Sequence, residues 1–132
     1  MNAEQETRAV YRKADALWSK FSCPSSGECC QLTLTGRQPW LWPSEWSVLK
    51  GDAPLPPKRA DGGCPFLDAA GRRCTRYADR PLGCRTFFCH RIEGPAAQPV
   101  LQMNALQERL ERINLNDDEE AQPLTLLDWH AR

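Results

Sequence analysis

The sequence predicts a small, mainly α-helical and loop-rich domain that a bound metal stabilises. Two amphipathic helices are expected to flank an irregular, cysteine-rich centre. Three observations predict this fold class. Seven cysteines occur among 132 residues, all of them between positions 23 and 89. Apolar residues recur at helical spacing on both sides of that region. Eleven prolines and eight glycines indicate many loops and a thin apolar core, which a metal site coupled to folding would reinforce.

The first flanking helix is expected over residues 4–20. Apolar side chains recur there at three- and four-residue steps with charged residues between them, and the stripe consists of Val10, Tyr11, Ala14, Leu17, Trp18 and Phe21. Such a stripe is typical of a helix that packs on a core. A groove on a partner protein is the alternative surface that it could contact.

The elements that follow are short. Residues 23–27 form a loop that brings the first cysteines into place, and residues 31–35 alternate like a short strand. A second helix is expected to begin near Pro43 because proline is favoured in the first turn, where Glu45 also suits the helix dipole. Gly51 is expected to end this helix.

The second half of the chain is expected to begin with a loop over 52–63 and a mostly irregular segment over 64–90. The pair Arg80-Pro81 opens a short helix that carries Cys84. A longer helix follows Pro99, with one apolar face formed by Met103, Leu106, Leu110 and Ile113. The acidic run 117–120 is expected to be a solvated connector. The apolar residues 124–129 are expected to dock back on the body.

The organisation is that of one domain over residues 1–132, with a cysteine motif region at 21–91 and a C-terminal helix and tail at 99–132. The chain begins with polar and acidic residues, so no secretory signal is expected. No apolar run is long enough for a membrane span. We therefore expect a cytoplasmic protein without a membrane partner. With 17 basic and 17 acidic residues, the balanced charge gives no reason to expect nucleic acid as a main partner.

The cysteines are interpreted as metal ligands, with a disulfide framework as the alternative. Cytoplasmic thiols are kept reduced, and an odd number of cysteines leaves one thiol over in any scheme of disulfides. Thiolates select zinc, copper(I) or iron–sulfur clusters. No Cys-x2-Cys pair of the kind found in zinc fingers is present. The adjacent Cys29 and Cys30 fit two metals or two corners of a cluster better than one ion, and the steps Cys23-Pro and Cys64-Pro are similar to ferredoxin motifs.

The segment 23–30, CPSSGECC, resembles the CxxCxxCC signature of the YkgJ-type cysteine-cluster family, whose members are described as zinc- or iron-chelating domains. The later pieces CPFLD from Cys64, RCTRY around Cys74 and RPLGCR around Cys84 resemble the same family's pattern. The family is bacterial, and the resemblance implies a zinc or iron cofactor, with a 4Fe–4S cluster as one form, rather than a reaction. Ser26 stands where the family has its second cysteine.

The expected metal ligands are all seven cysteines: Cys23, Cys29, Cys30, Cys64, Cys74, Cys84 and Cys89. Cys64, Cys74 and Cys84 carry the family-like spacing. Cys89 or His90 would substitute for the ligand missing at Ser26.

Several arginines surround the ligands, and Arg80 and Arg85 lie within the motif itself. We expect these two to bind the cofactor indirectly, by offsetting the negative charge of the thiolates. Contact with an anionic substrate is the alternative. Near the C-terminus, His130 is expected to be an exposed tail residue. Trp40, Trp42 and Trp46 form a local aromatic cluster that is expected to pack in the core or as a lid, with a stacking platform for a nucleobase or another planar ligand as the alternative.

Three functions compete. The first is a metal-binding module whose site holds the fold and presents a surface to a protein partner. The second is an iron–sulfur redox protein or an accessory of a modifying enzyme, and the third is a metal carrier or sensor. The sequence shows no Ser/His/Asp arrangement, no Gly-rich phosphate loop and no carboxylate pair placed by a motif. An enzyme is therefore the less favoured interpretation, and the binding module is preferred.

Overall fold

A computed structural model describes residues 2–19, 38–71, 73–85 and 99–132. Its main elements are α1 (Ala3–Leu17), β1 (Trp40–Leu41), α3 (Pro43–Lys50), a 3-10 turn at Tyr77–Asp79, α4 (Leu82–Arg85), α5 (Val100–Asp117), β2 (Leu124–Thr125) and α6 (Leu126–His130). The mainly α-helical fold class that the sequence predicts is confirmed. The loop expected over 23–27 and the strand expected over 31–35 lie outside the described residues.

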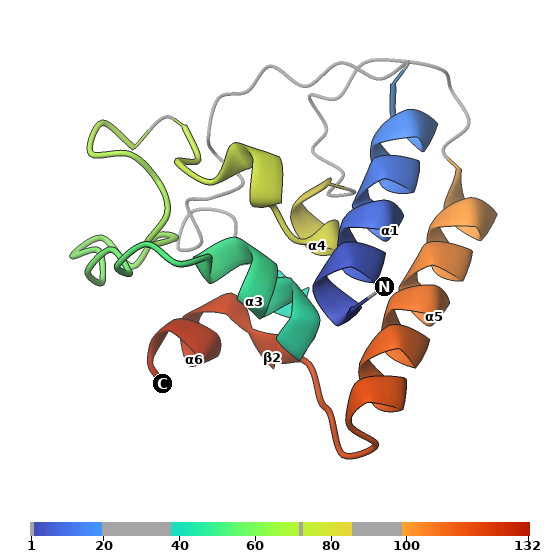
Figure 1. Ribbon diagram of the computed structural model, residues 1–132. Helices are drawn as coiled ribbons and strands as arrows, with labels where there is room; N and C mark the ends of the chain where they lie inside the picture. Colours follow the sequence, from blue (N-terminus) through green and yellow to red (C-terminus); the bar gives the residue numbers. More distant parts are fainter. Residues whose placement is uncertain (1, 20–37, 72, 86–98) are drawn as a thin grey trace.

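The helix α1 begins one residue earlier than expected and ends at Leu17. Asn2 caps it, because its side-chain oxygen accepts the amide hydrogen of Gln5 at 2.9 Å while the Gln5 side chain accepts that of Asn2 at 3.0 Å. Figure 1 shows α1 and the long α5 side by side. The expected apolar face of α5 is confirmed, since Met103, Leu106, Leu110 and Ile113 are all buried against α1.

Two apolar clusters form the core. The first lies between α1 and α5 and also includes Val48 and Leu82. The second lies beside α3 and contains Leu41, Trp46, Leu49, Cys64, Phe66, Leu67 and Leu126. Because α1 and α5 pack directly on each other, the loop that contains Cys64 and Cys74 does not lie between the two flanking helices. It packs instead against α3 and the C-terminal segment.

Buried polar side chains join three of the helices. Thr7 of α1 donates its hydroxyl hydrogen to Ser44 of α3 at 2.7 Å, and the side chain of Asn114 of α5 bonds both the amide and the hydroxyl of Ser44 at 2.9 Å. Each of these buried groups is therefore hydrogen-bonded, which avoids the cost of unsatisfied polar burial. The start of α3 is fixed against both flanking helices, and Gly51 ends it with a positive φ of 55°, as the sequence predicts.

The C-terminal segment docks on the body, as expected, and adds a strand pair that the sequence does not reveal. In the antiparallel pair β1–β2, Trp40 lies opposite Thr125 and Leu41 opposite Leu124. The acidic run is exposed, as expected. The expectation for His130 is wrong: this side chain is partly buried, and its Nε2 lies 2.7 Å from the carbonyl oxygen of Pro56. No helix in the described parts of the chain is long and apolar enough to span a membrane.

Candidate metal centre

Cys64 and Cys74 lie on the two arms of one narrow loop. Cys64 begins a turn in which its carbonyl accepts the amide hydrogen of Leu67 at 3.0 Å, and Leu67 in turn forms an antiparallel bridge with Cys74. The amide of Thr75 donates to the carbonyl of Phe66 at 2.7 Å and closes the loop. Both cysteines pack on the second apolar cluster, and Cys64 is 5% exposed. The fold therefore brings these two sequence-predicted ligands to the same part of the molecule.

Arg59 supports this loop from outside. Its guanidinium donates to the carbonyl of Asp68 at 2.8 Å and pairs with the carboxylate of Asp61 at 3.0 Å. Asp61 also accepts the amide hydrogen of Gly63 at 2.9 Å. The hydrogen bond from Arg59 lowers the pKa of Asp61 below its ordinary value, and the hydrogen bond from the Gly63 amide lowers it further. No motif marks Arg59, because its contacts with the cysteine loop are made to the backbone carbonyls of Leu67 and Asp68.

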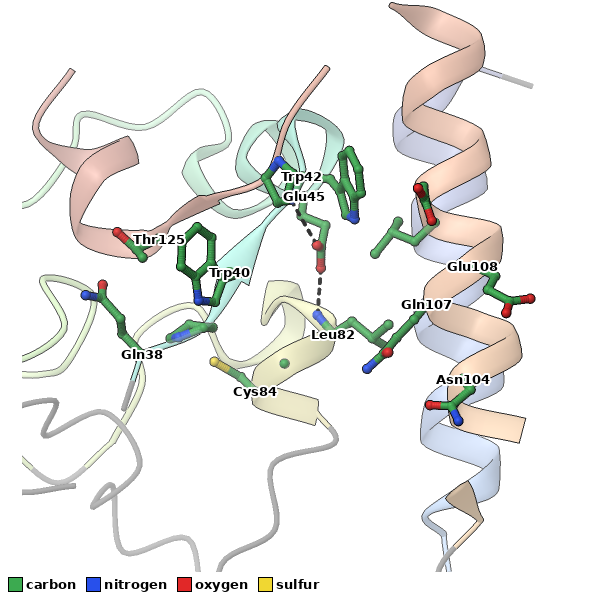
Figure 2. A pocket seen from close by; sticks show the side chains of 15 residues that line it. Gln38, Trp40, Trp42, Glu45, Leu82, Cys84, Asn104, Gln107, Glu108 and Thr125 are labelled. Atoms are coloured by element: carbon green, nitrogen blue, oxygen red, sulfur yellow. Dashed lines mark hydrogen bonds between the residues drawn. The ribbon is translucent and has the colours of Figure 1, made fainter. Parts of the chain in front are cut away.

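Cys84 lies on a different element, the short helix α4, which follows Arg80-Pro81 as the sequence predicts. Its amide donates to the carbonyl of Pro81 at 3.0 Å. The first amide of the helix, that of Leu82, donates to Glu45 Oε2 at 2.7 Å (Figure 2). A carboxyl group from α3 thus holds the N-terminal end of the helix that presents Cys84.

Among the described residues, Glu45 has the most deeply buried carboxyl group, with 1% of the residue exposed. Besides Leu82, it accepts the Tyr11 hydroxyl hydrogen at 3.0 Å and the Trp42 amide hydrogen at 3.1 Å. Burial raises the pKa of Glu45, and burial together with the nearby Glu45 raises the pKa of Tyr11. The sequence indicated only a helix-dipole role for Glu45, since its contacts with α1 and α4 arise from the tertiary fold.

Arg85 fixes the other end of α4. Its guanidinium donates to both carboxylate oxygens of Asp15 on α1, at 2.9 and 2.8 Å, and it lies 4.3 Å from the centre of the Tyr11 ring. It also donates to the backbone carbonyls of Ala78 and Arg80. The side chain is only 5% exposed. These contacts hold the segment around Cys84 against α1, which is a positioning role.

Arg80 is placed differently. Its guanidinium lies 3.7 Å from the centre of the Tyr77 ring, and its Nε donates to the carbonyl of Tyr77 at 2.8 Å. Both motif arginines thus donate hydrogen bonds to backbone carbonyls in the segment 77–80, which lies just before the helix that carries Cys84. That either side chain also offsets the negative charge of the thiolates stays a prediction.

The described residues contain only part of the predicted ligand set. Within residues 2–19, 38–71, 73–85 and 99–132, no three His, Cys, Asp or Glu side chains gather closely enough to hold a metal ion. No disulfide joins any two of Cys64, Cys74 and Cys84. The predicted ligands Cys23, Cys29, Cys30 and Cys89 lie outside the described residues, as do Ser26 and His90.

The three neighbouring tryptophans have three different environments. Trp46 is buried and stacks on Trp129, with ring centroids 6.1 Å apart and planes 12° apart. Trp42 packs at the edge of the first apolar cluster, whereas Trp40 is 62% exposed. The expectation of core packing therefore holds for Trp46 and in part for Trp42, and it is wrong for Trp40. The strand pair of β1 with β2 leaves the Trp40 side chain at the surface while Leu41 is buried.

Comparison with protein families decides the affiliation of the chain. The model of a family named CxxCxxCC, described as "Putative zinc- or iron-chelating domain", matches residues 22–109. The chain belongs to this family. Comparison with curated proteins gave no match, and comparison with solved structures gave none either.

The CxxCxxCC match covers all seven cysteines and continues into α5, beyond the expected motif region of 21–91. It confirms the resemblance inferred from the cysteine spacing. At this level the function is metal binding, with zinc or iron as the metal. The continuation into α5 has a physical reason, because the buried face of α5 packs against α1 and Leu82, which hold the Cys84 segment in place.

Proposed function

We propose that this chain is a cytosolic metal-binding module that holds zinc or iron through thiolates from several segments of its motif region. Its ligands are Cys64, Cys74 and Cys84, together with cysteines from the set Cys23, Cys29, Cys30 and Cys89. The observation that carries the proposal is the family match over the region that contains every cysteine. Thiolate is the ligand type that zinc, iron and their clusters share.

The way in which the described cysteines are held supports this proposal. The Cys64–Cys74 loop is closed by backbone hydrogen bonds and supported by Arg59. The Cys84 helix is held separately, by Glu45 and Arg85. Two segments that are each ordered by their own contacts limit the conformational entropy that metal binding must overcome.

A structural site that presents a surface to a protein partner is preferred to a catalytic site. A catalytic zinc keeps one coordination position open beside three protein ligands, whereas structural sites are closed by four. Seven cysteines offer more thiolates than one closed site needs. The surplus is also the reason to consider more than one metal.

An iron–sulfur protein is the second candidate, and the adjacent Cys29 and Cys30 favour it. Neighbouring side chains diverge from each other, so two such thiolates suit two corners of a cluster better than one ion. Such a protein would serve in electron transfer or as an accessory of a modifying enzyme.

One experiment separates the two candidates. The protein is purified without oxygen, and zinc, iron and acid-labile sulfide are measured per chain. A colourless protein with zinc and without sulfide supports the structural module. A brown protein with iron and sulfide in similar amounts supports the cluster. A chain that holds neither metal would contradict both.

Ser26 provides a further test of the ligand set. A serine hydroxyl is a poor ligand at neutral pH, so the native site either uses Cys89 or His90 in its place or leaves a coordination position open. We expect Ser26→Cys to raise metal affinity, measured by competition with a chromophoric chelator. If Cys89 or His90 is the substitute ligand, Cys89→Ala or His90→Ala should lower the metal content. Unchanged affinity and content in all three variants would place residue 26 outside the site.

A further inference from the structure

A cavity of about 1020 Å³ lies between the strand pair β1–β2, the helix α4 and the helix α5. Its volume is comparable to that of pockets that hold small organic ligands, roughly 300–1,000 Å³. Figure 2 shows Gln38 and Trp40 on one side of it and Asn104, Gln107 and Glu108 on the α5 side. None of the functions discussed above uses this cavity, although Cys84 reaches its edge.

The wall formed by α5 is polar and acidic. Asn104, Gln107, Glu108 and Glu111 recur at three- and four-residue steps, so they share one exposed stripe of the helix that faces the cavity. The basic residues of the same part of α5, Arg109 and Arg112, are not in the lining. Within the described residues, neither Glu108 nor Glu111 forms an ion pair. Among the described residues, these two carboxylates of the cavity lining therefore have no neutralising partner.

The opposite wall is aromatic. Trp40 is 62% exposed, which is unusual for a residue of this size, and Trp42 is partly buried beside it. No lysine, arginine or histidine occurs among the described residues that line the cavity, although the chain as a whole has equal numbers of basic and acidic residues. An indole face attracts an organic cation, and carboxylates on the facing wall attract the same group.

We propose that this cavity binds an organic cation, an alkylammonium or guanidinium group, between Trp40 and the carboxylates of Glu108 and Glu111. The cation would come either from a small amine or from a basic side chain of a polypeptide. The apolar stem of the ligand would lie along Leu82 and Leu110, which also line the cavity. None of the three groups that would bind the cation is a predicted metal ligand, although the predicted ligand Cys84 also lines the cavity.

The first arm of the test uses the full chain, with n-butylguanidinium as the probe and n-butylurea as its neutral isostere. NMR titration follows the indole N–H signals, and Trp40→Phe identifies the Trp40 signal. We expect saturable shifts of that signal with the cation and much weaker shifts with the urea. Equal binding of the two probes, or no saturable binding of the cation, would overturn the proposal.

The second arm uses variants. The double change Glu108→Gln and Glu111→Gln should weaken cation binding about three- to tenfold, since exposed ion pairs contribute modestly. Glu119→Gln, an exposed acidic residue outside the cavity, is the matched control and should change nothing. Trp40→Ala should weaken binding about two- to fivefold. Equal losses in the control and the double variant would overturn the proposal.

The third arm distinguishes the sources of the cation. A short neutral-ended peptide with a central arginine should bind more tightly than n-butylguanidinium if a polypeptide side chain is the ligand, and less tightly if a small amine is. The metal content of every variant is measured alongside. Loss of cation binding at full metal content would then be a property of the cavity alone, distinct from any failure of the metal proposal.

Discussion

The carboxyl group of Glu45 accepts hydrogen bonds from a phenol and two backbone amides, and one of those amides begins the helix that carries Cys84. The contact spans 37 positions of the sequence between Glu45 and Leu82. No local pattern can reveal such a contact, because it depends on how α3 and α4 meet. By contrast, the helix start at Pro43 and the helix end at Gly51 follow from backbone preferences that each residue carries by itself.

The titration of Glu45 gives a pH prediction. Burial raises its pKa above the ordinary value of 4.5 that the unfolded chain retains. Between these two pKa values the folded state binds the additional proton, so the stability due to Glu45 is present at low pH and is lost as pH rises through the folded-state pKa. We expect the wild type to gain stability relative to Glu45→Gln as the pH falls from about 8 to about 5, measured by urea unfolding.

The comparison with Glu45→Gln cancels the titration of other groups, the cysteines included. A wild type that loses stability relative to the variant over the same pH range would contradict the prediction. It would show that the three donors outweigh burial and keep the carboxylate ionised.

Arg85 gives a second prediction at the residue scale. Lysine cannot reproduce the paired bonds to Asp15 together with the bonds to two backbone carbonyls, because it lacks the planar fork of donors. We expect Arg85→Lys to lower the free energy of unfolding by about 1–3 kcal/mol. The matched control is Arg8→Lys, since Arg8 makes one exposed ion pair with Asp79 at 2.8 Å and should cost less than about 0.5 kcal/mol. Equal effects of the two changes would contradict the positioning role of Arg85.

At the scale of elements, long periodic segments were predictable and short non-local ones were not. The helices α1 and α5 repeat their apolar residues over several turns, so both were found with their buried faces. The strands β1 and β2 have two residues each, too few for alternation to show. Their pairing joins positions about 85 residues apart, which only the tertiary fold determines. The same holds for the contact of His130 with Pro56.

The docking of α6 gives a prediction at this scale. Trp129 stacks on Trp46, and its indole N–H donates to the carbonyl of Leu41 at 2.8 Å. We expect Trp129→Ala to cost about 2–4 kcal/mol of unfolding free energy, because it leaves a gap in the cluster that contains Cys64. Trp40→Ala, at an exposed position, is the matched control and should cost less than about 1 kcal/mol. Both are measured by chemical denaturation, and similar costs would show that α6 contributes little to the core.

At the scale of the whole molecule, two apolar clusters support a chain whose described residues between α3 and α4 are largely irregular. The family match places the metal function in the motif region, and the predicted ligands span positions 23 to 89. Cysteine spacing was sufficient to infer metal binding and the family. The coordination geometry could not be inferred, because it depends on how segments distant in sequence converge.

Metal removal tests whether the site is structural. We expect chelation under reducing conditions to lower the melting temperature by about 10 °C or more, since the binding free energy of a structural metal is also folding free energy. Differential scanning calorimetry of the metal-bound and metal-free forms measures this change, and readdition of the metal is the control. An unchanged melting temperature would mean that the metal does not hold the fold.

The central claim is that thiolates of the described loop and helix bind the metal together with the remaining cysteines. Metal content per chain in Cys84→Ser, purified without oxygen beside the wild type, tests it most directly. Arg8→Lys is the control for purification and folding. We expect full metal content in the wild type and the control and a large loss in Cys84→Ser, with smaller or equal losses in Cys64→Ser and Cys74→Ser. Full metal occupancy in a folded Cys84→Ser protein would contradict the claim.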